Sequence, residues 1–207
     1  MKRWNIALAV GTFVILSGCG GIEKMTETTV AVDEQGNVEQ LLVEDFSDAA
    51  YQLEELETMV NELITSYNQE AGEDAVVLKS AKLKEETARL LMEYQSAKDY
   101  RGFNQVDFFC GSVKEAQNQG YTFHSAFADT NGTEVSNEGI PAQCEDAQVL
   151  ILREPMQVVV PGKILYVSKN MEVVGETQAK LPADESQDMD NQVTTQAYGY
   201  VIYQAED

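Results

Sequence analysis

Leu53-Glu-Glu-Leu-Glu-Thr-Met-Val-Asn-Glu-Leu-Ile-Thr-Ser-Tyr67 is the stretch of this sequence that decides its predicted fold. Apolar residues recur at helical spacing and share one face, while glutamates gather on the opposite face: the apolar set is Leu53, Leu56, Val60, Leu63, Ile64 and Tyr67. Ser47 is a good N-cap, and Gly72 stands where a helix should already have ended. We therefore expect a long amphipathic helix from about Asp48 to Gln69.

Two β-hairpins flank this helix in the sequence. Residues 28–32 and 38–43 are β-rich and enclose the turn Asp33-Glu-Gln-Gly36, which predicts the first hairpin. Residues 75–83 and 87–94 predict the second hairpin in the same way. Because hairpin strands run antiparallel, this order favours an α+β fold over strands that alternate singly with helices.

Two short helices and a series of strands complete the predicted fold. Ser96 caps a helix that runs to about Phe103, and Ser112 caps another over residues 113–119. The remaining strand-like segments are residues 106–109, 121–128, 148–152, 157–160, 164–167, 172–174 and 193–203. We therefore expect an α+β domain: a largely antiparallel sheet, one long amphipathic helix packed on it, and two short helices.

The length and charge of the chain restrict its domain organisation and its partners. Residues 28–207 are expected to form a single extracytoplasmic domain, although a sub-boundary in the polar region near 129–147 stays open. The formal net charge of −21 repels nucleic acid, whose binding needs a basic surface, so we expect no nucleic-acid partner. The same charge keeps the domain away from anionic lipid headgroups.

The first residues have the order of a secretory signal peptide. Lys2 and Arg3 precede an apolar run over residues 6–16, which is shorter than the roughly 20 residues that a spanning helix needs. The small residues Ser17-Gly18 then provide a cleavage site. We expect residues 1–18 to be removed.

Leu16-Ser17-Gly18-Cys19 resembles the lipobox of bacterial lipoproteins. The resemblance implies that the Cys19 thiol carries a diacylglyceryl group, and two acyl chains hold a protein stably on a membrane. Residues 19–27 would then form the lipidated N-terminus and a short tether. The expected location is the cell membrane, outside the cytoplasm; an ordinary signal peptide with a chance cysteine is the alternative.

Four further stretches resemble a group of uncharacterised lipoproteins of anaerobic Gram-positive gut bacteria. They are Gln40–Tyr67, Glu93–Asn104, Gly111–Tyr121 and Pro161–Ser168. The resemblance implies a location on the cell envelope, and it carries no activity and no catalytic residue.

Two cysteines remain once Cys19 is assigned to lipid. Cys110 lies in an apolar segment, whereas Cys144 lies in the polar segment 141–146, which is expected to be a loop. An even number of cysteines in an oxidising compartment permits a Cys110–Cys144 disulfide. Two buried free thiols are the alternative.

Residues able to bind metal or perform catalysis are few. Asp184, Asp188 and Asp190 are weak calcium candidates, but the spacing of an EF-hand is absent and a solvated acidic loop is the preferred interpretation. The single histidine, His124, is expected to face solvent because Phe123 beside it should face the core. Neither a cofactor nor a metal is expected.

No phosphate-binding loop, nucleophile elbow or acylation motif appears, so the sequence does not predict an enzyme. The pair Ser80 and Lys82 is interpreted as a solvated strand edge. Nine tyrosines, some near the C-terminus, are mainly core candidates but would also suit a carbohydrate or peptide surface. The preferred function is a non-enzymatic cell-envelope binding or interaction module that contacts an envelope protein or a small ligand. The alternatives are a ligand-binding lipoprotein for peptide, sugar or metal and, less favoured, an enzyme built on carboxylates.

Overall fold

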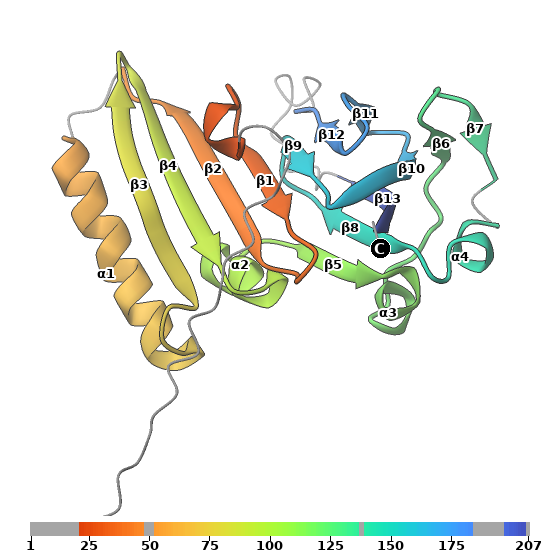
Figure 1. Ribbon diagram of the computed structural model, residues 1–207, viewed down its shortest axis with the longest axis horizontal. Helices are drawn as coiled ribbons and strands as arrows, with labels where there is room; N and C mark the ends of the chain where they lie inside the picture. The colour runs from red at the N-terminus through yellow and green to blue at the C-terminus, as the bar shows by residue number, and fades with distance from the viewer. Residues whose placement is uncertain (1–20, 48–51, 137–138, 184–196, 206–207) are drawn as a thin grey trace, which may run out of the picture.

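The protein has an α+β fold with two β-sheets (Figure 1). The structure, a computed structural model, describes residues 21–47, 52–136, 139–183 and 197–205. The predicted signal peptide, Cys19 and the acidic candidates Asp184, Asp188 and Asp190 lie outside these ranges. None of the helices within them is both long and apolar enough to cross a membrane.

Both predicted hairpins are confirmed. Strands β1 (Thr29–Val32) and β2 (Val38–Asp45) pair antiparallel, as do β3 (Val76–Lys84) and β4 (Thr87–Tyr94). The first turn closes because the carboxylate of Asp33 accepts a 2.8 Å hydrogen bond from the backbone N–H of Asn37. Since β3 is an edge strand, Ser80 and Lys82 lie on the solvated edge that the sequence predicted.

The long helix is confirmed, but it begins later than expected. Helix α1 spans Leu53–Ala71 and ends at Gly72, whose φ of 128° suits glycine. Ser47 is not its N-cap: the backbone N–H of Ser47 donates to the Asp45 carboxylate at 2.9 Å, and Gln52 occupies the cap position. The helix contacts mainly β3, and Ile64 is its one buried residue.

The prediction of one largely antiparallel sheet is wrong, because the strands form two sheets and one of these is mixed. The seven-stranded sheet has the order β11-β12-β9-β1-β2-β4-β3, with β9 (Met156–Val159), β11 (Glu172–Val173) and β12 (Gln178–Leu181). Strand β9 runs parallel to β1, with Val30 opposite Val158. A long crossover connection joins these two strands, so the turn signals that predict a hairpin cannot predict their pairing.

The second sheet is antiparallel and has six strands, in the order β5-β8-β13-β10-β6-β7. These are β5 (Phe108–Ser112), β8 (Gln148–Leu152), β13 (Gly199–Ala205), β10 (Gly162–Ser168), β6 (Phe127–Asp129) and β7 (Glu134–Val135). The strand predicted over residues 121–128 shrinks to β6. One reason is that the Thr122 carbonyl accepts a 2.8 Å hydrogen bond from the Tyr200 hydroxyl instead of pairing with a strand.

Both predicted short helices are present. Helix α2 spans Ala97–Asn104 and α3 spans Val113–Asn118. Their caps are the predicted serines: Ser96 Oγ accepts from the Asp99 N–H, and Ser112 Oγ accepts from the Glu115 N–H, each at 3.1 Å. A further short helix, α4 (Ile140–Gln143), lies in the region expected to be a loop.

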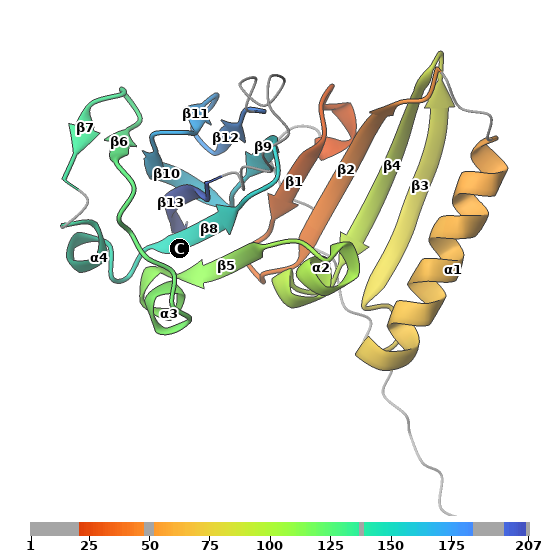
Figure 2. The same ribbon diagram turned by 180° about the vertical axis from the view of Figure 1, so that it is seen from behind.

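The main hydrophobic core lies between the two sheets and joins both halves of the chain. It contains Val30 and Val32 from β1 together with Leu150, Leu152 and Val201 from the second sheet. The outer face of the second sheet carries another cluster, which includes residues of α3 and α4. Figure 2 shows both helices at the end of the molecule away from α1. Strands from both sides of residues 129–147 build the seven-stranded sheet, so the fold does not divide there.

At the junction of β9 and β10 the chain crosses from one sheet to the other. Val160 and Pro161 connect the two strands, and β10 begins at Gly162. A Cβ on Gly162 would stand 2.0 Å from the carbonyl oxygen of Gln204, so the close approach of β13 admits only glycine.

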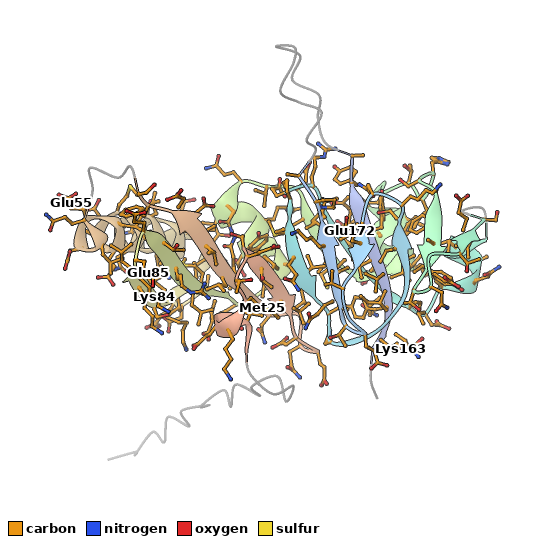
Figure 3. The ribbon with its side chains drawn as sticks, turned by 90° about the horizontal axis from the view of Figure 1, so that it is seen from above. Met25, Glu55, Lys84, Glu85, Lys163 and Glu172 are labelled. Carbon is orange, nitrogen blue, oxygen red and sulfur yellow. The ribbon has the colours of Figure 1, made fainter. Side chains whose placement is uncertain are left out.

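Seen from above, Glu55 on α1 lies at one end of the molecule, far from Glu172 and Lys163 on the C-terminal strands (Figure 3).

Candidate functional site

A pocket of about 300 Å³ forms where the ends of α2 and α3 meet the start of β13. We name it the tyrosine–arginine pocket. Its lining residues are Arg101, Gln119, Gly120, Tyr121, Thr122, Tyr198 and Tyr200. They come from three separate parts of the chain, so the fold, and not one motif, builds the pocket.

Local structure brings Tyr121 to this position. Helix α3 stops at Asn118, and Gly120 with a φ of 91° reverses the chain. The Tyr121 N–H then donates back to the Ala116 carbonyl at 3.0 Å. This turn directs the chain away from the helix axis and sets Tyr121 beside the start of β13.

The tyrosine rings are held by aromatic contacts. Tyr121 and Tyr198 meet edge to face, with centroids 5.6 Å apart, and Phe109 packs on Tyr121 at 5.3 Å. Tyr200 is buried against Phe123 and reaches Tyr198 at 6.3 Å. Because these contacts fix the rings before any ligand arrives, a ligand does not need to order them.

Sheet register places three polar residues next to the pocket. Leu152 of β8 pairs with Phe108 of β5 on one side and with Gly199 of β13 on the other. The residues just beyond these three, Asp107, Arg153 and Tyr198, therefore lie side by side at one end of the sheet.

Asp107 and Arg153 fix the orientation of Tyr198. The guanidinium carbon of Arg153 lies 4.1 Å from the Tyr198 ring centroid, and its Nη1 is 3.1 Å from Asp107 Oδ2. The Tyr198 hydroxyl donates to the same Asp107 oxygen at 3.2 Å. Both Arg153 and Tyr198 thus bind Asp107, and the guanidinium of Arg153 balances the charge of this carboxylate.

The pocket tyrosines stay protonated at neutral pH. Burial raises the pKa of Tyr200 to about 12, and the neighbouring Tyr198 adds to this. Burial also raises the pKa of Tyr121 and of Tyr198. The charge of Arg153 opposes this at both, Arg101 opposes it at Tyr121, and Asp107 adds to it at both. The site therefore combines aromatic rings, hydroxyl donors and guanidinium groups.

Arg101 differs from Arg153 in having no ion-pair partner among the described residues. Its side chain is exposed on the last turn of α2, and its guanidinium forms no ion pair or hydrogen bond with any residue in the described ranges. Carboxylates are abundant in this chain, so an arginine at the rim of a pocket with no carboxylate partner in the described ranges is unusual.

The structure does not join Cys110 to Cys144, and both are free thiols. Alternation along β5 turns Cys110 toward the main core, where its Sγ lies 3.5 Å from the Tyr203 hydroxyl. Cys144 caps the end of α4 in the cluster on the opposite face of the sheet, and it is buried where a polar loop was expected. Burial raises the pKa of both thiols.

The other candidate residues that the structure describes are not among the residues that line the pocket. His124 is exposed while Phe123 and Phe127 are buried, as the sequence predicted. Among the residues that the structure describes, no three His, Cys, Asp or Glu side chains form a group able to hold a metal ion.

Sequence reasoning singled out the C-terminal tyrosines but missed Arg101, Tyr121 and Arg153. These residues lie far apart in the chain, and no local spacing relates them. The chain matches no model of a known protein family, no curated protein and no solved structure.

Proposed function

We propose that this chain is a lipid-anchored binding protein of the cell envelope, facing outside the cytoplasm, with the tyrosine–arginine pocket as its ligand site. The lipid anchor rests on the sequence Leu16-Ser17-Gly18-Cys19 alone. Binding rests on the pocket, and the two parts of the proposal are tested separately.

One observation carries the binding part: three tyrosine rings converge on a single concavity with an arginine that has no ion-pair partner among the described residues. Aromatic rings and fixed polar groups occur together in small-molecule sites, and a volume of about 300 Å³ is at the lower end of their size range; the surface of this pocket is more polar than apolar. Aromatic side chains with a polar tip supply contact area at little conformational cost.

The chemistry of the pocket suits binding rather than proton transfer. Tyrosines with raised pKa values donate hydrogen bonds at neutral pH and do not act as bases. An arginine guanidinium stays charged over the whole physiological range. We therefore expect the site to hold a small ligand, of which sugars and short peptides are the leading classes.

The anchor is tested by feeding cells a labelled fatty acid. Wild-type chain should carry the label, and Cys19→Ala should lose it. Cys110→Ala is the control and should keep the label. If Cys19→Ala retains the label, the lipid anchor is contradicted, and the assignment of the pocket is unaffected.

The pocket is tested by thermal unfolding of the full chain in detergent with a panel of neutral and acidic sugars, short peptides and calcium chloride. A compound at about 100 times its Kd should stabilise the wild type by roughly 2.7 kcal/mol. Tyr198→Ala should abolish this shift, whereas Tyr166→Ala, at a half-buried tyrosine outside the pocket, should keep it. No shift with any compound, or an equal shift in Tyr198→Ala, contradicts the assignment.

A further inference from the structure

The charge balance of the tyrosine–arginine pocket indicates the class of its ligand. The charged side chains that act on Tyr121 are Arg101, Arg153 and Asp107. Because Asp107 pairs with Arg153, the positive charge of Arg101 is left over. Counted over the residues that the structure describes, the pocket therefore has an excess positive charge, which favours an anionic ligand over a cationic or neutral one.

The guanidinium of Arg101 is suited to a carboxylate in particular. Its planar fork of N–H groups matches the two oxygens of a carboxylate, and such charge-assisted pairs are stronger than neutral hydrogen bonds. Arg101 already lines the pocket and has no partner among the described residues, so binding breaks no existing ion pair.

The remaining surface of the pocket suits a sugar ring. Tyr121 is half exposed, and its hydroxyl makes no hydrogen bond to any residue in the described part of the chain. The exposed amide of Gln119 and the exposed hydroxyl of Thr122 lie beside it. A pyranose offers an apolar C–H face for the tyrosine ring and hydroxyls for these groups.

The same geometry disfavours an extended peptide. Peptides commonly bind by adding a strand to an unpaired sheet edge. The one strand at this pocket, β13, lies between β8 and β10 and is paired on both sides. The groups left for a ligand are therefore mainly side chains.

We infer that the tyrosine–arginine pocket binds an acidic saccharide, with the carboxylate on Arg101 and the sugar ring against Tyr121. This inference rests on the proposed function, because it specifies the ligand of the same pocket. The ligand chemistry is that of a uronic acid, either free or at the end of an oligosaccharide.

The test is isothermal calorimetry on the full chain in detergent. The probes are D-galacturonic and D-glucuronic acid, their methyl esters, a galacturonate trisaccharide, and glucose. The acids should bind about tenfold more tightly than the esters, because esterification removes the charge that Arg101 pairs with. If the trisaccharide binds more tightly than the monosaccharide, the ligand is the end of an oligosaccharide. If the two bind equally, the ligand is the free sugar.

Variants of the arginine make the test specific. Arg101→Gln should bring the affinity for the acids down to that for the esters, and Arg101→Lys should retain part of the difference. Lys98→Gln, which removes a charge from the same helix outside the pocket, should leave the difference unchanged.

The outcomes separate this inference from the proposed function. Tyr198-dependent binding of neutral sugars with no preference for acids overturns the acidic saccharide and leaves the binding protein standing. Tighter binding of a short peptide through its C-terminal carboxylate also overturns the saccharide. If no compound of the wider panel binds in a Tyr198-dependent manner, the proposed function itself fails.

Discussion

Arg153 lies over the ring of Tyr198, its guanidinium carbon 4.1 Å from the ring centroid. A cation above an aromatic face is attracted by the quadrupole of the ring, by about 0.5–1 kcal/mol at exposed sites and more when water is excluded. The contact holds the tyrosine that forms one wall of the pocket, so it links the stability of the fold to the shape of the site.

Two substitutions of Tyr198 should distinguish the contribution of its ring to stability from that of its hydroxyl. Tyr198→Ala loses the contacts with Arg153 and Tyr121 and should lower the free energy of unfolding by about 1–2 kcal/mol. Tyr198→Phe keeps the ring and gives up only the hydrogen bond to Asp107, so it should cost about 1 kcal/mol or less. Urea denaturation measures both, and equal losses would mean that the hydroxyl matters more than the ring.

A polar network between the seven-stranded sheet and α2 should be sensitive to the removal of a single oxygen. The Tyr94 hydroxyl donates to Gln40 Oε1 at 2.8 Å and accepts from the Asn104 amide at 3.1 Å. Tyr94→Phe leaves both partners with an unmet hydrogen bond, so we expect a loss of about 1–3 kcal/mol. Tyr166→Phe, whose hydroxyl bonds to no described residue, is the control; equal unfolding midpoints in the two variants would contradict the network's role.

Stability should fall at alkaline pH. Burial raises the pKa of Tyr94, Tyr100 and Tyr203 above the ordinary value of 10, and it raises the pKa of Tyr200 to about 12. The folded state then holds these protons more tightly than the unfolded state. Their contribution is therefore fully present below about pH 10 and begins to be lost above it, with a slope of up to roughly 1.4 kcal/mol per pH unit for each tyrosine; the contribution of Tyr200 is lost by about pH 12, and that of the other three at higher pH.

Urea midpoints measured from about pH 9 upward would show this loss. Tyr200→Phe removes one of the titrating groups, so its stability curve should be less steep between about pH 10 and pH 12. A wild-type midpoint that stays constant across this range would rule out the raised pKa values.

Adjacent residues of α1 provide a matched pair for the helix contact. Ile64 is 8% exposed and belongs to the main core, whereas Leu63 is 55% exposed. Ile64→Ala should cost about 2–5 kcal/mol of unfolding free energy, because it leaves a cavity. Leu63→Ala should stay within about 0.5 kcal/mol of the wild type. A large loss in Leu63→Ala would show that another surface covers this face of α1.

Local sequence features predicted much of the first half of the fold. The 3.6-residue period placed α1, the turn at Gly36 placed the first hairpin, and Ser96 and Ser112 capped their helices as expected. Each feature acts within a few residues, so a single sequence suffices to detect it.

The remaining features depend on contacts between distant residues. Val30 and Val158 pair in parallel, but the apolar runs around them are compatible with many partners. Apolar and polar residues alternate after Gly120 as they do in a strand, but the Thr122 carbonyl accepts a hydrogen bond from the Tyr200 hydroxyl instead of from a neighbouring strand. Arg101, Tyr121 and Tyr198 come together only once the second sheet has formed, so the pocket had no local sequence pattern.

The parallel pairing of β1 with β9 sets the order in which the seven-stranded sheet can close. Strand β9 follows β1 by about 130 residues, so during the proposed export β1 reaches the folding compartment well before its partner. Until then the β9-facing edge of β1 is open to strands of other chains. Completion of the seven-stranded sheet therefore waits for residues 156–159, and a nascent chain that stops earlier presents an aggregation-prone edge instead of a smaller folded protein.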